Sequence, residues 1–240
     1  MSTIDLKEVE KFSAIADEWW SESGKFKPLH QFNPIRLSYI TRKISEHFKG
    51  VKFSDLKIAD IGCGGGLMCE PLARLGAQLT GVDAAEKNIA VAKIHAEKSQ
   101  LKINYLITTV EDLAQQQPAS FDVVMALEII EHVADVKTFI EACASLVKPG
   151  GILLIATMNR TIKSLLLAKI AAEYVLRFLP IGTHDWKKFL KPSQINEYAA
   201  ASGMELKEIM GFSYDLLNKE WRENSCDIEV NYISYYVRCV

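Results

Sequence analysis

The residues with the clearest chemical potential in this chain are a run of glycines and an acidic residue about 20 positions later. The glycines, at 62 and 64–66, follow a short apolar run that predicts a buried strand. Glycine adopts positive φ and carries no Cβ, so a ligand can lie directly against this backbone. Asp83 ends the next apolar run, where its carboxylate can accept hydrogen bonds from ribose hydroxyls. The pattern predicts a βαβ nucleoside site, and a plain glycine turn is the alternative.

The glycine spacing favours S-adenosylmethionine over a dinucleotide. The dinucleotide fingerprint G-x-G-x-x-G needs its last glycine where this chain has Leu67. Asp60 precedes the turn, and an acidic residue suits a cationic ligand better than a pyrophosphate. S-adenosylmethionine carries an α-ammonium group and a ribose but no phosphate. An NAD-dependent oxidoreductase is therefore the less favoured alternative.

A second candidate group consists of Glu128, Glu131 and His132, which follow the strand predicted at 121–127. Residues spaced i, i+3 and i+4 share a helix face, so these side chains can converge on one cation. Two carboxylates with one imidazole suit magnesium, manganese or zinc. His132 could instead act alone as a general base, and Glu131 and His132 could simply flank the helix predicted at 133–147. The residues alone leave these alternatives open.

Strand-like apolar runs alternate with helical patterns through the middle of the chain, which predicts a doubly wound parallel sheet. We expect strands at 58–61, 78–82, 103–107, 121–127 and 152–157, helices at 67–75, 85–99 and 133–147, and a turn at 148–151. In such sheets a ligand binds outside the carboxyl ends of the strands. The residues that map to this rim are Gly62, Asp83, Glu111, Leu127 and Asn159. Glu111 could equally cap a short helix.

Further segments flank this core on both sides. A first helix is predicted at 5–20, and a second begins at Asn33-Pro34 and extends to about residue 48. Arg36 would then lie in the first turn, where the helix dipole disfavours a cation, so it either serves a ligand or is a solvated surface arginine. A helix at 192–202 and strands at 204–214 and 229–240 complete the pattern.

The composition is that of a globular protein with one α/β domain, at 49% hydrophobic and 24% charged residues. A net charge of −2 gives no basic field for binding nucleic acid. The five cysteines are an odd number without a C-x-x-C pair, so they predict neither a zinc site nor a disulfide framework. Free thiols suggest a reducing compartment, and the first ten residues lack the apolar stretch of a signal peptide.

Over nearly its whole length the chain closely resembles the ubiquinone-biosynthesis O-methyltransferases. The motifs that carry the resemblance are Asp60-Ile-Gly-Cys-Gly-Gly-Gly66, Trp19-Trp20, Phe26-Lys-Pro-Leu-His30, Asn33-Pro-Ile-Arg-Leu37, Glu128-Ile-Ile-Glu-His-Val133, Leu146-Val-Lys-Pro-Gly-Gly151, Asn159-Arg160, Gly182-Thr-His-Asp185, Lys188-Phe189 and residues 227–232. Methyltransferases in general share the glycine turn and the Pro-Gly-Gly turn but not the other motifs. Trp221, Arg222 and Glu223 lie in the region of weakest match.

The resemblance implies a class I S-adenosylmethionine-dependent methyltransferase fold. This is an α/β fold with a doubly wound, seven-stranded, mainly parallel sheet, an N-terminal helical segment and a helical insert after strand 5. We expect one domain over 1–240, with a helical cap at 1–50, a cofactor-binding core at 51–160, an insert or lid at 161–192 and a C-terminal helix and strands at 193–240.

The resemblance also implies residue roles and a reaction. The expected cofactor-binding residues are Arg36, Gly62, Asp83 and Leu127, and the expected metal ligands are Glu128, Glu131 and His132. His132 is also the candidate catalytic base. The expected reaction is O-methylation of polyprenylated phenol or catechol intermediates at both O-methylation steps, with Mg²⁺ or in its place Zn²⁺ or Mn²⁺. Another small-molecule acceptor, or a non-catalytic cofactor-binding subunit, is the alternative.

The expected partners are the polyprenylated phenol or quinol substrate, other ubiquinone-biosynthesis enzymes and a membrane surface, but no nucleic acid. Such a protein would be cytoplasmic and peripheral to the inner face of the membrane. The insert at 162–182 is apolar, and its Lys163, Lys169 and Arg177 suit anionic lipid headgroups. Its charges and Pro180 make it a poor spanning helix, so we expect a membrane-docking lid, with a buried helix or dimer contact as the alternative.

His30 and His184 would flank the substrate entrance or be ordinary loop histidines.

Overall fold

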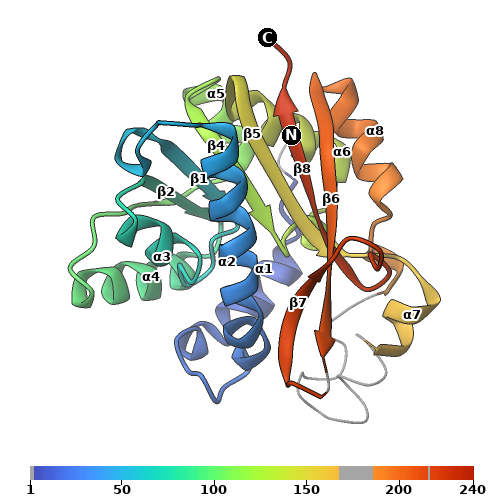
Figure 1. Cartoon of the computed structure of the whole chain (residues 1–240). Helices are drawn as coiled ribbons and strands as arrows, with labels where there is room; N and C mark the ends of the chain where they lie inside the picture. The colour runs from blue at the N-terminus through green and yellow to red at the C-terminus, as the bar shows by residue number, and fades with distance from the viewer. Residues whose placement is uncertain (1–2, 168–185, 216) are drawn as a thin grey trace.

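The computed structural model describes residues 3–167, 186–215 and 217–240, and its centre is an eight-stranded sheet (Figure 1). The strand order is β3-β2-β1-β4-β5-β8-β6-β7. Strands β1 to β5 pair in parallel, whereas β8, β6 and β7 pair antiparallel at one end of the sheet. The strands are β1 Lys57–Ile61, β2 Gln78–Asp83, β3 Asn104–Ile107, β4 Phe121–Leu127, β5 Val147–Met158, β6 Met204–Asp215, β7 Glu220–Asn224 and β8 Asn231–Arg238.

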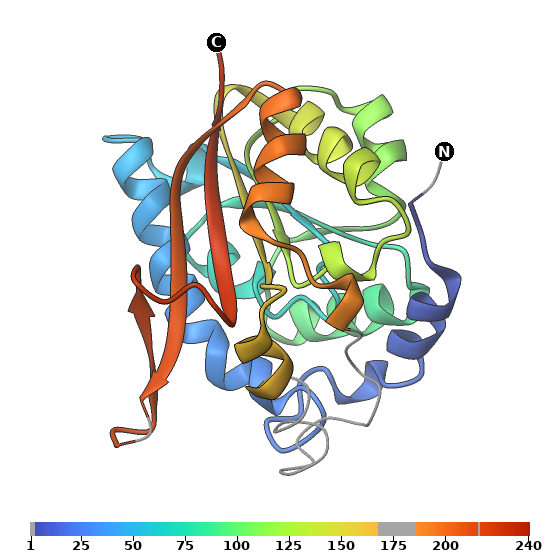
Figure 2. The same cartoon turned by 90° about the vertical axis from the view of Figure 1, so that its right-hand side faces the viewer.

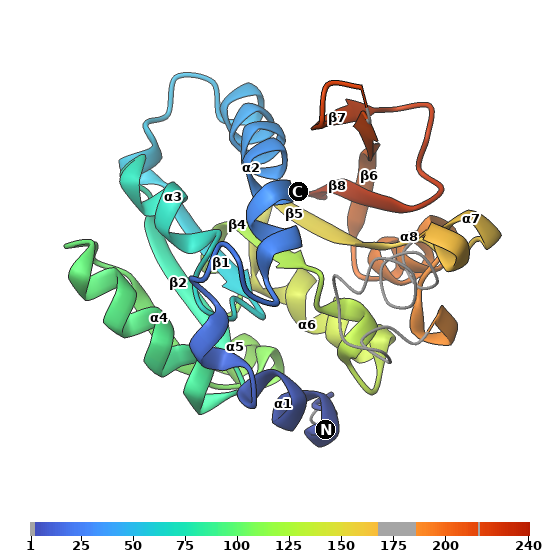
Figure 3. The same cartoon turned by 90° about the horizontal axis from the view of Figure 1, so that it is seen from below.

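Helices cover both faces of this sheet, as Figures 1 and 3 show: α2, α3 and α4 lie on one face, and α5, α6 and α8 on the other. The helices are α1 Leu6–Ser13, α2 Lys27–His47, α3 Cys69–Arg74, α4 Glu86–Lys98, α5 Val110–Gln116, α6 Val136–Leu146, α7 Ile162–Ser164 and α8 Pro192–Ala201. The predicted α/β class and the doubly wound, mainly parallel sheet are therefore confirmed.

The central strand β4 shows why continuous apolar runs form the middle of the sheet. Val123 and Met125 pack with α2, while Val124 and Ala126 pack with the helices of the opposite face. All four side chains are fully buried, so each face of the strand contributes to a separate core. Burial of each valine or methionine side chain contributes about 1.5–3 kcal/mol to the stability of the fold. This burial holds in place the strand whose carboxyl end forms part of the rim.

The sheet has eight strands instead of the seven expected. The additional strand is β7, which forms a hairpin with β6 through the pair Tyr214 and Trp221. Trp221 packs on Phe32 of α2, with ring centroids 4.6 Å apart. The segment that matched the family least is thus held to α2 by this aromatic contact and by the ion pair between Arg42 and Glu223.

The N-terminal helices also differ from the prediction. The helix expected at 5–20 ends at Ser13 and is followed by a short 3₁₀ turn, Ala16–Glu18. The second helix begins at Lys27 because Pro28 takes a first-turn position, and Pro34 lies inside it. Arg36 is therefore well inside the helix, and the argument from the helix dipole is wrong.

Two further differences concern the region after β4. The turn expected at 148–151 belongs to β5, whose Val147 pairs with Phe121 before a register shift. Most of the insert at 162–182, together with His184, lies outside the described residues. Within 3–167, 186–215 and 217–240, no helix is long and apolar enough to cross a membrane.

The order of the strands reverses between β1 and β4, and this is where parallel α/β sheets bind ligands. The carboxyl ends of these strands lie along the lower edge of the sheet in Figure 1, and the N-terminal helical segment runs past that edge (Figure 2). The fold therefore brings α1 and the start of α2 to the rim on which the sequence places its candidate site.

Candidate active site

The glycine turn and Asp83 meet as predicted at the ends of β1 and β2. The backbone N–H of Gly64 donates to Asp83 Oδ2 at 3.0 Å, and that of Ala85 donates to Asp83 Oδ1 at 2.7 Å. Gly62 has a φ of +75°, a conformation that favours glycine. Asn88 Nδ2 also donates to Asp83 Oδ1 at 3.3 Å. An ionised carboxylate has about four acceptor positions, so Asp83 retains capacity for about one ribose hydroxyl.

Two tryptophans cover this turn. Trp19 Nε1 donates to Asn88 Oδ1 at 2.9 Å, and Trp20 Nε1 donates to the carbonyl oxygen of Gly65 at 2.9 Å. A Cβ on Gly64 would lie 2.3 Å from the Trp19 ring. The glycine backbone therefore faces an indole in this structure, whereas the sequence predicted a surface open to a ligand. The helix predicted at 5–20 includes both tryptophans, but the sequence gave no signal for these long-range contacts.

Arg36 is a buried cation beside the turn, with 3% of its surface exposed. Its Nη1 donates to Glu128 Oε1 at 3.0 Å, and its Nη2 donates to Asn33 Oδ1. Its Nε has no hydrogen-bond partner among the residues that the structure describes. Burial lowers the pKa of Arg36, and the carboxylates of Glu128 and Asp60 oppose that effect. A buried guanidinium with an unpaired donor is suited to bind a ligand carboxylate.

Glu128 stands at the end of β4 in a strained backbone conformation. Its φ is +52°, which costs a non-glycine residue about 1–2 kcal/mol. Burial and the neighbouring Glu131 carboxyl raise the pKa of Glu128 to about 7. Strain and a shifted pKa often occur together at functional sites, so the geometry supports a functional role for this position.

The remaining members of the predicted metal group point to other partners. Glu131 is buried and its Oε2 accepts from Thr157 Oγ1 at 2.8 Å. His132 Nδ1 lies 3.0 Å from Glu8 Oε2 on α1. Over the described part of the chain, no group of three histidine, cysteine, aspartate or glutamate side chains is placed to hold a metal. The carboxyls of Glu128 and Glu131 are thus neighbours, but the three-ligand site is not formed in this structure.

The other predicted rim residues mostly have structural partners. Leu127 is partly buried and pairs with Ala156 of β5, so it lies at the rim but shows no polar contact. Glu111 accepts from Thr3 Oγ1 at 2.5 Å and does not cap α5, because Thr109 fills that role. Asn159 Nδ2 donates to the carbonyl oxygen of Ile228 at 2.8 Å.

The histidine expected at the substrate entrance from the N-terminal side is also engaged. His30 Nε2 lies 2.8 Å from the carbonyl oxygen of Trp19. This contact joins the start of α2 to the segment that covers the glycine turn. His30 therefore orders the cover of the site, and whether it contacts a substrate stays a prediction.

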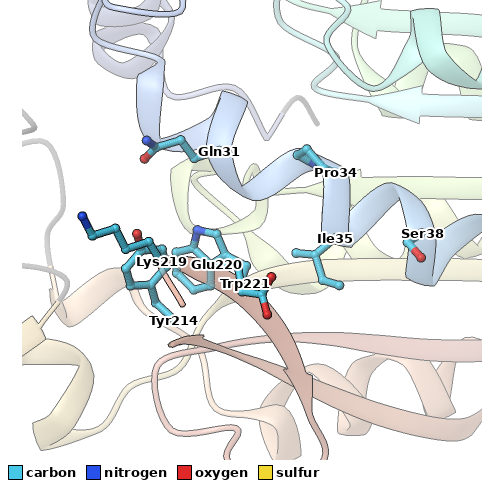
Figure 4. A pocket seen from close by; sticks show the side chains of 8 residues that line it. All are labelled: Gln31, Pro34, Ile35, Ser38, Tyr214, Lys219, Glu220 and Trp221. Atoms are coloured by element: carbon cyan, nitrogen blue, oxygen red, sulfur yellow. The ribbon is translucent and has the colours of Figure 1, made fainter. Parts of the chain in front are cut away.

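A separate cavity of about 440 Å³ lies between α2 and the β6–β7 hairpin (Figure 4). Its walls are Gln31, Pro34, Ile35, Ser38, Tyr214, Lys219, Glu220 and Trp221. In Figure 4 the α2 side chains face the hairpin side chains across the cavity. None of the residues singled out as catalytic or cofactor-binding lines it.

Comparison with known proteins gives consistent results over the chain. A family model described as a methyltransferase domain matches residues 59–155. The ubiquinone biosynthesis O-methyltransferase of Pelagibacter ubique is 47% identical, covering 99% of this chain and 100% of that protein. The protein of the same name from Bartonella tribocorum is 50% identical, covering 97% of this chain and 95% of that protein.

Solved structures support the fold. The plantazolicin methyltransferase BpumL in complex with a monoazolic desmethylPZN analog and SAH has a TM-score of 0.66 and 20% identity, with 98% of each chain covered. The magnesium protoporphyrin IX methyltransferase of Synechocystis with bound SAM has a TM-score of 0.59 and 15% identity, covering 95% of this chain and 96% of that chain. At these identities the likeness shows the class I methyltransferase architecture alone.

Proposed function

Because this chain belongs to the family of ubiquinone biosynthesis O-methyltransferases, we propose that it transfers the methyl group of S-adenosylmethionine to a hydroxyl oxygen of a polyprenylated phenol or catechol. The observation that carries the proposal is the identity of 47–50% to proteins of that name over 97–99% of this chain. From the family we also predict that this protein catalyses both O-methylation steps of the pathway.

The site residues fit the cofactor. Asp83 keeps acceptor capacity for a ribose at the end of β2, and the buried Arg36 has an unpaired donor for a carboxylate. We assign the backbone of Gly62 to the methionine end, and Leu127 to packing at the end of β4. When bound, S-adenosylmethionine supplies an electrophilic methyl group on a sulfonium sulfur. The protein must therefore position the acceptor oxygen in line with that methyl group.

The acceptor hydroxyl needs to lose its proton. A phenol with a pKa of about 10 requires about 4 kcal/mol for ionisation at pH 7, at ~1.4 kcal/mol per pKa unit. His132 follows β4 on the rim and is the group that we assign as general base. Its Nδ1 is engaged by Glu8, so the proton would be taken at Nε2.

We further propose that a divalent cation, Mg²⁺ or in its place Zn²⁺ or Mn²⁺, binds at Glu128 and Glu131. Burial and the neighbouring Glu131 carboxyl raise the pKa of Glu128 to about 7, and a cation would stabilise both carboxylates in the charged form. The three-ligand set with His132 does not fit this conformation, so the base role of His132 is independent of the cation.

A membrane-docking role for residues 162–182 supports delivery of a prenylated substrate. In the described part of this segment, Ile162, Leu166 and Leu167 expose 74%, 52% and 51% of their surfaces. Exposed apolar side chains suit the surface of a bilayer, and Lys163 lies among them in the described part, where it pairs with Asp227 and Glu229. We expect the protein to float with anionic liposomes and the double variant Leu166→Glu with Phe178→Glu to lose flotation while remaining folded. Equal flotation of this variant would reject the docking role only.

The activity is tested by incubation with labelled S-adenosylmethionine and short-chain demethylated quinols, followed by mass spectrometry. Label on a ring oxygen supports the proposal. Label transfer to a different small acceptor would show another methyltransferase specificity. Tight binding of S-adenosylhomocysteine without any transfer would indicate a non-catalytic subunit.

A further inference from the structure

Glu8 of the N-terminal helix α1 contacts the proposed base from 124 positions away in the sequence. Its Oε2 lies 3.0 Å from His132 Nδ1, and the two side chains are 19% and 10% exposed. Glu8 lies in the N-terminal helical segment and His132 follows the central strand β4, so only the path of the N-terminal segment along the rim brings them together. Neither the spacing of Glu8 nor the Glu128-to-His132 motif predicts this pair.

The direction of this hydrogen bond follows from the charge of Glu8. The ammonium groups of Lys188 and Lys11 both lie beside the Glu8 carboxyl, which is therefore ionised at neutral pH. An ionised carboxylate can only accept hydrogen bonds. His132 Nδ1 must therefore carry the proton, and the proton that is gained or lost during a reaction resides on Nε2.

Other contacts hold both partners of this pair in place. Lys188 Nζ lies 3.2 Å from Glu8 Oε1 and 3.2 Å from Asp5 Oδ2, so the second carboxylate oxygen of Glu8 is also engaged. Lys11 Nζ lies 3.4 Å from Glu8 Oε2. Phe12 makes an edge contact with the His132 ring, with centroids 5.1 Å apart and an interplanar angle of 85°.

The chain that precedes α1 is fixed to the same region. The backbone N–H of Ala134 donates to the carbonyl oxygen of Thr3 at 2.8 Å, two residues after His132. The Thr3 side chain donates to the buried Glu111. Helix α1 is therefore attached on both sides of Glu8, which gives the carboxylate a defined position relative to the imidazole.

We propose that Glu8 is a positioning residue for methyl transfer, which holds His132 in the Nδ1–H form and leaves the Nε2 lone pair for the acceptor hydroxyl. This inference depends on the proposed role of His132 in the reaction. A carboxylate that accepts the second ring N–H fixes the tautomer and the orientation of an imidazole. The same arrangement would serve a base and a metal ligand, since both uses need an unprotonated Nε2.

The test is ¹⁵N NMR of the full-length protein with labelled histidine, at a slightly alkaline pH. The chain has five histidines, and the His132→Gln variant identifies the His132 signals. We expect wild-type His132 to show a protonated Nδ1 and an unprotonated Nε2. Glu8→Ala should move the proton toward Nε2 and lower kcat about 10- to 100-fold. Glu8→Gln keeps one acceptor oxygen and should retain part of the wild-type pattern.

Two controls separate positioning from a general structural effect. Glu10→Gln changes an exposed carboxylate on the same helix and should alter neither the tautomer nor kcat. Binding of S-adenosylhomocysteine should be unchanged in the Glu8 variants, because the side-chain contacts of Glu8 are with Lys11, His132 and Lys188. A wild-type proton on Nε2, or a fall in kcat without a tautomer change, would overturn the proposal. Failure of the wild type to transfer methyl groups would instead reject the proposed function, because the tautomer is measured without turnover.

Discussion

Arg36 and Glu128 form a largely buried ion pair at the point where helix α2 meets the end of β4. Arg36 Nη1 and Glu128 Oε1 are 3.0 Å apart, and their side chains are 4% and 20% exposed. The pair joins residues 92 positions apart. The Glu128 carboxylate balances the charge of the Arg36 guanidinium, which also lies near the carboxyls of Asp60 and Glu131. Both members belong to the predicted site, so the cofactor end and the reactive end of that site are electrostatically coupled.

Removal of Arg36 should be costly because Glu128 would remain buried without its counter-ion. We expect Arg36→Met to lower the free energy of unfolding by about 3–5 kcal/mol. Arg42→Met on the same helix is the matched control, since Arg42 is 40% exposed and its ion pairs should contribute only ~1 kcal/mol or less. Urea unfolding of both variants measures the difference, and equal losses would contradict a special role for the Arg36 pair.

Asp83 should be important for cofactor affinity. Asp83→Asn removes one acceptor oxygen that serves Gly64 and would serve a ribose, so the affinity for S-adenosylhomocysteine should fall by about 1–3 kcal/mol. Asp122→Asn is the control, because Asp122 binds Lys57 and Lys148 at the amino end of the strands. Calorimetric titration gives both affinities. If Asp83→Asn binds S-adenosylhomocysteine as tightly as the wild type, the ribose must bind elsewhere.

Gly64 should tolerate alanine poorly for two separable reasons. Its φ is +54°, and an added Cβ would meet the Trp19 ring. Gly50 has a φ of +80° but no atom within 4 Å of an added Cβ, so Gly50→Ala measures the backbone cost alone, about 1–2 kcal/mol. We expect Gly64→Ala to lose more stability than Gly50→Ala and to bind S-adenosylhomocysteine more weakly. Equal losses of stability of the two variants in thermal unfolding would show that the Trp19 ring can move aside without loss of free energy.

Local patterns predicted the parts of the fold in which neighbouring residues share one environment. The apolar run of β4, Phe121–Leu127, was predicted with its observed bounds because every second side chain enters one of two cores. Strand β7, Glu220–Asn224, was missed because its sequence is mostly polar and its position depends on the distant Phe32. Periodicity contains no information about such contacts.

The candidate site likewise contains features that local sequence patterns predict and features that depend on residues distant in sequence. The proximity of the glycine turn to Asp83 was anticipated, because a βαβ unit brings adjacent strand ends together, but the hydrogen bond from Gly64 to Asp83 was not. The Glu8–His132 pair and the cover of the glycine turn by Trp19 were not, because both depend on the path of the N-terminal segment. The expected convergence of His132 with the two glutamates assumed a regular helix, whereas these residues form a 3₁₀ turn after a strained Glu128.

Metal removal tests the proposed cation directly. Treatment with a chelator should lower turnover, and added Mg²⁺ should restore it, because Glu128 and Glu131 would no longer share a counter-ion. Glu131→Gln should weaken Mg²⁺ binding, which can be measured by calorimetry without substrate. If the chelated protein retains full turnover, the cation is not required and His132 is sufficient as the base.

Acid should weaken the attachment of α1 in a way that depends on Glu8. Its pKa is lowered to about 2 from the ordinary 4.5, chiefly by the hydrogen bond from His132, so the folded state favours the ionised form. Glu8 therefore contributes stability that is fully present above pH 4.5 and is lost as the pH falls through about 2. Urea unfolding of wild type and Glu8→Gln across this range should show a stability difference that shrinks as the pH falls, while Glu10→Gln shows none. A difference that stays constant down to pH 2 would mean that Glu8 acts through packing and not through its charge.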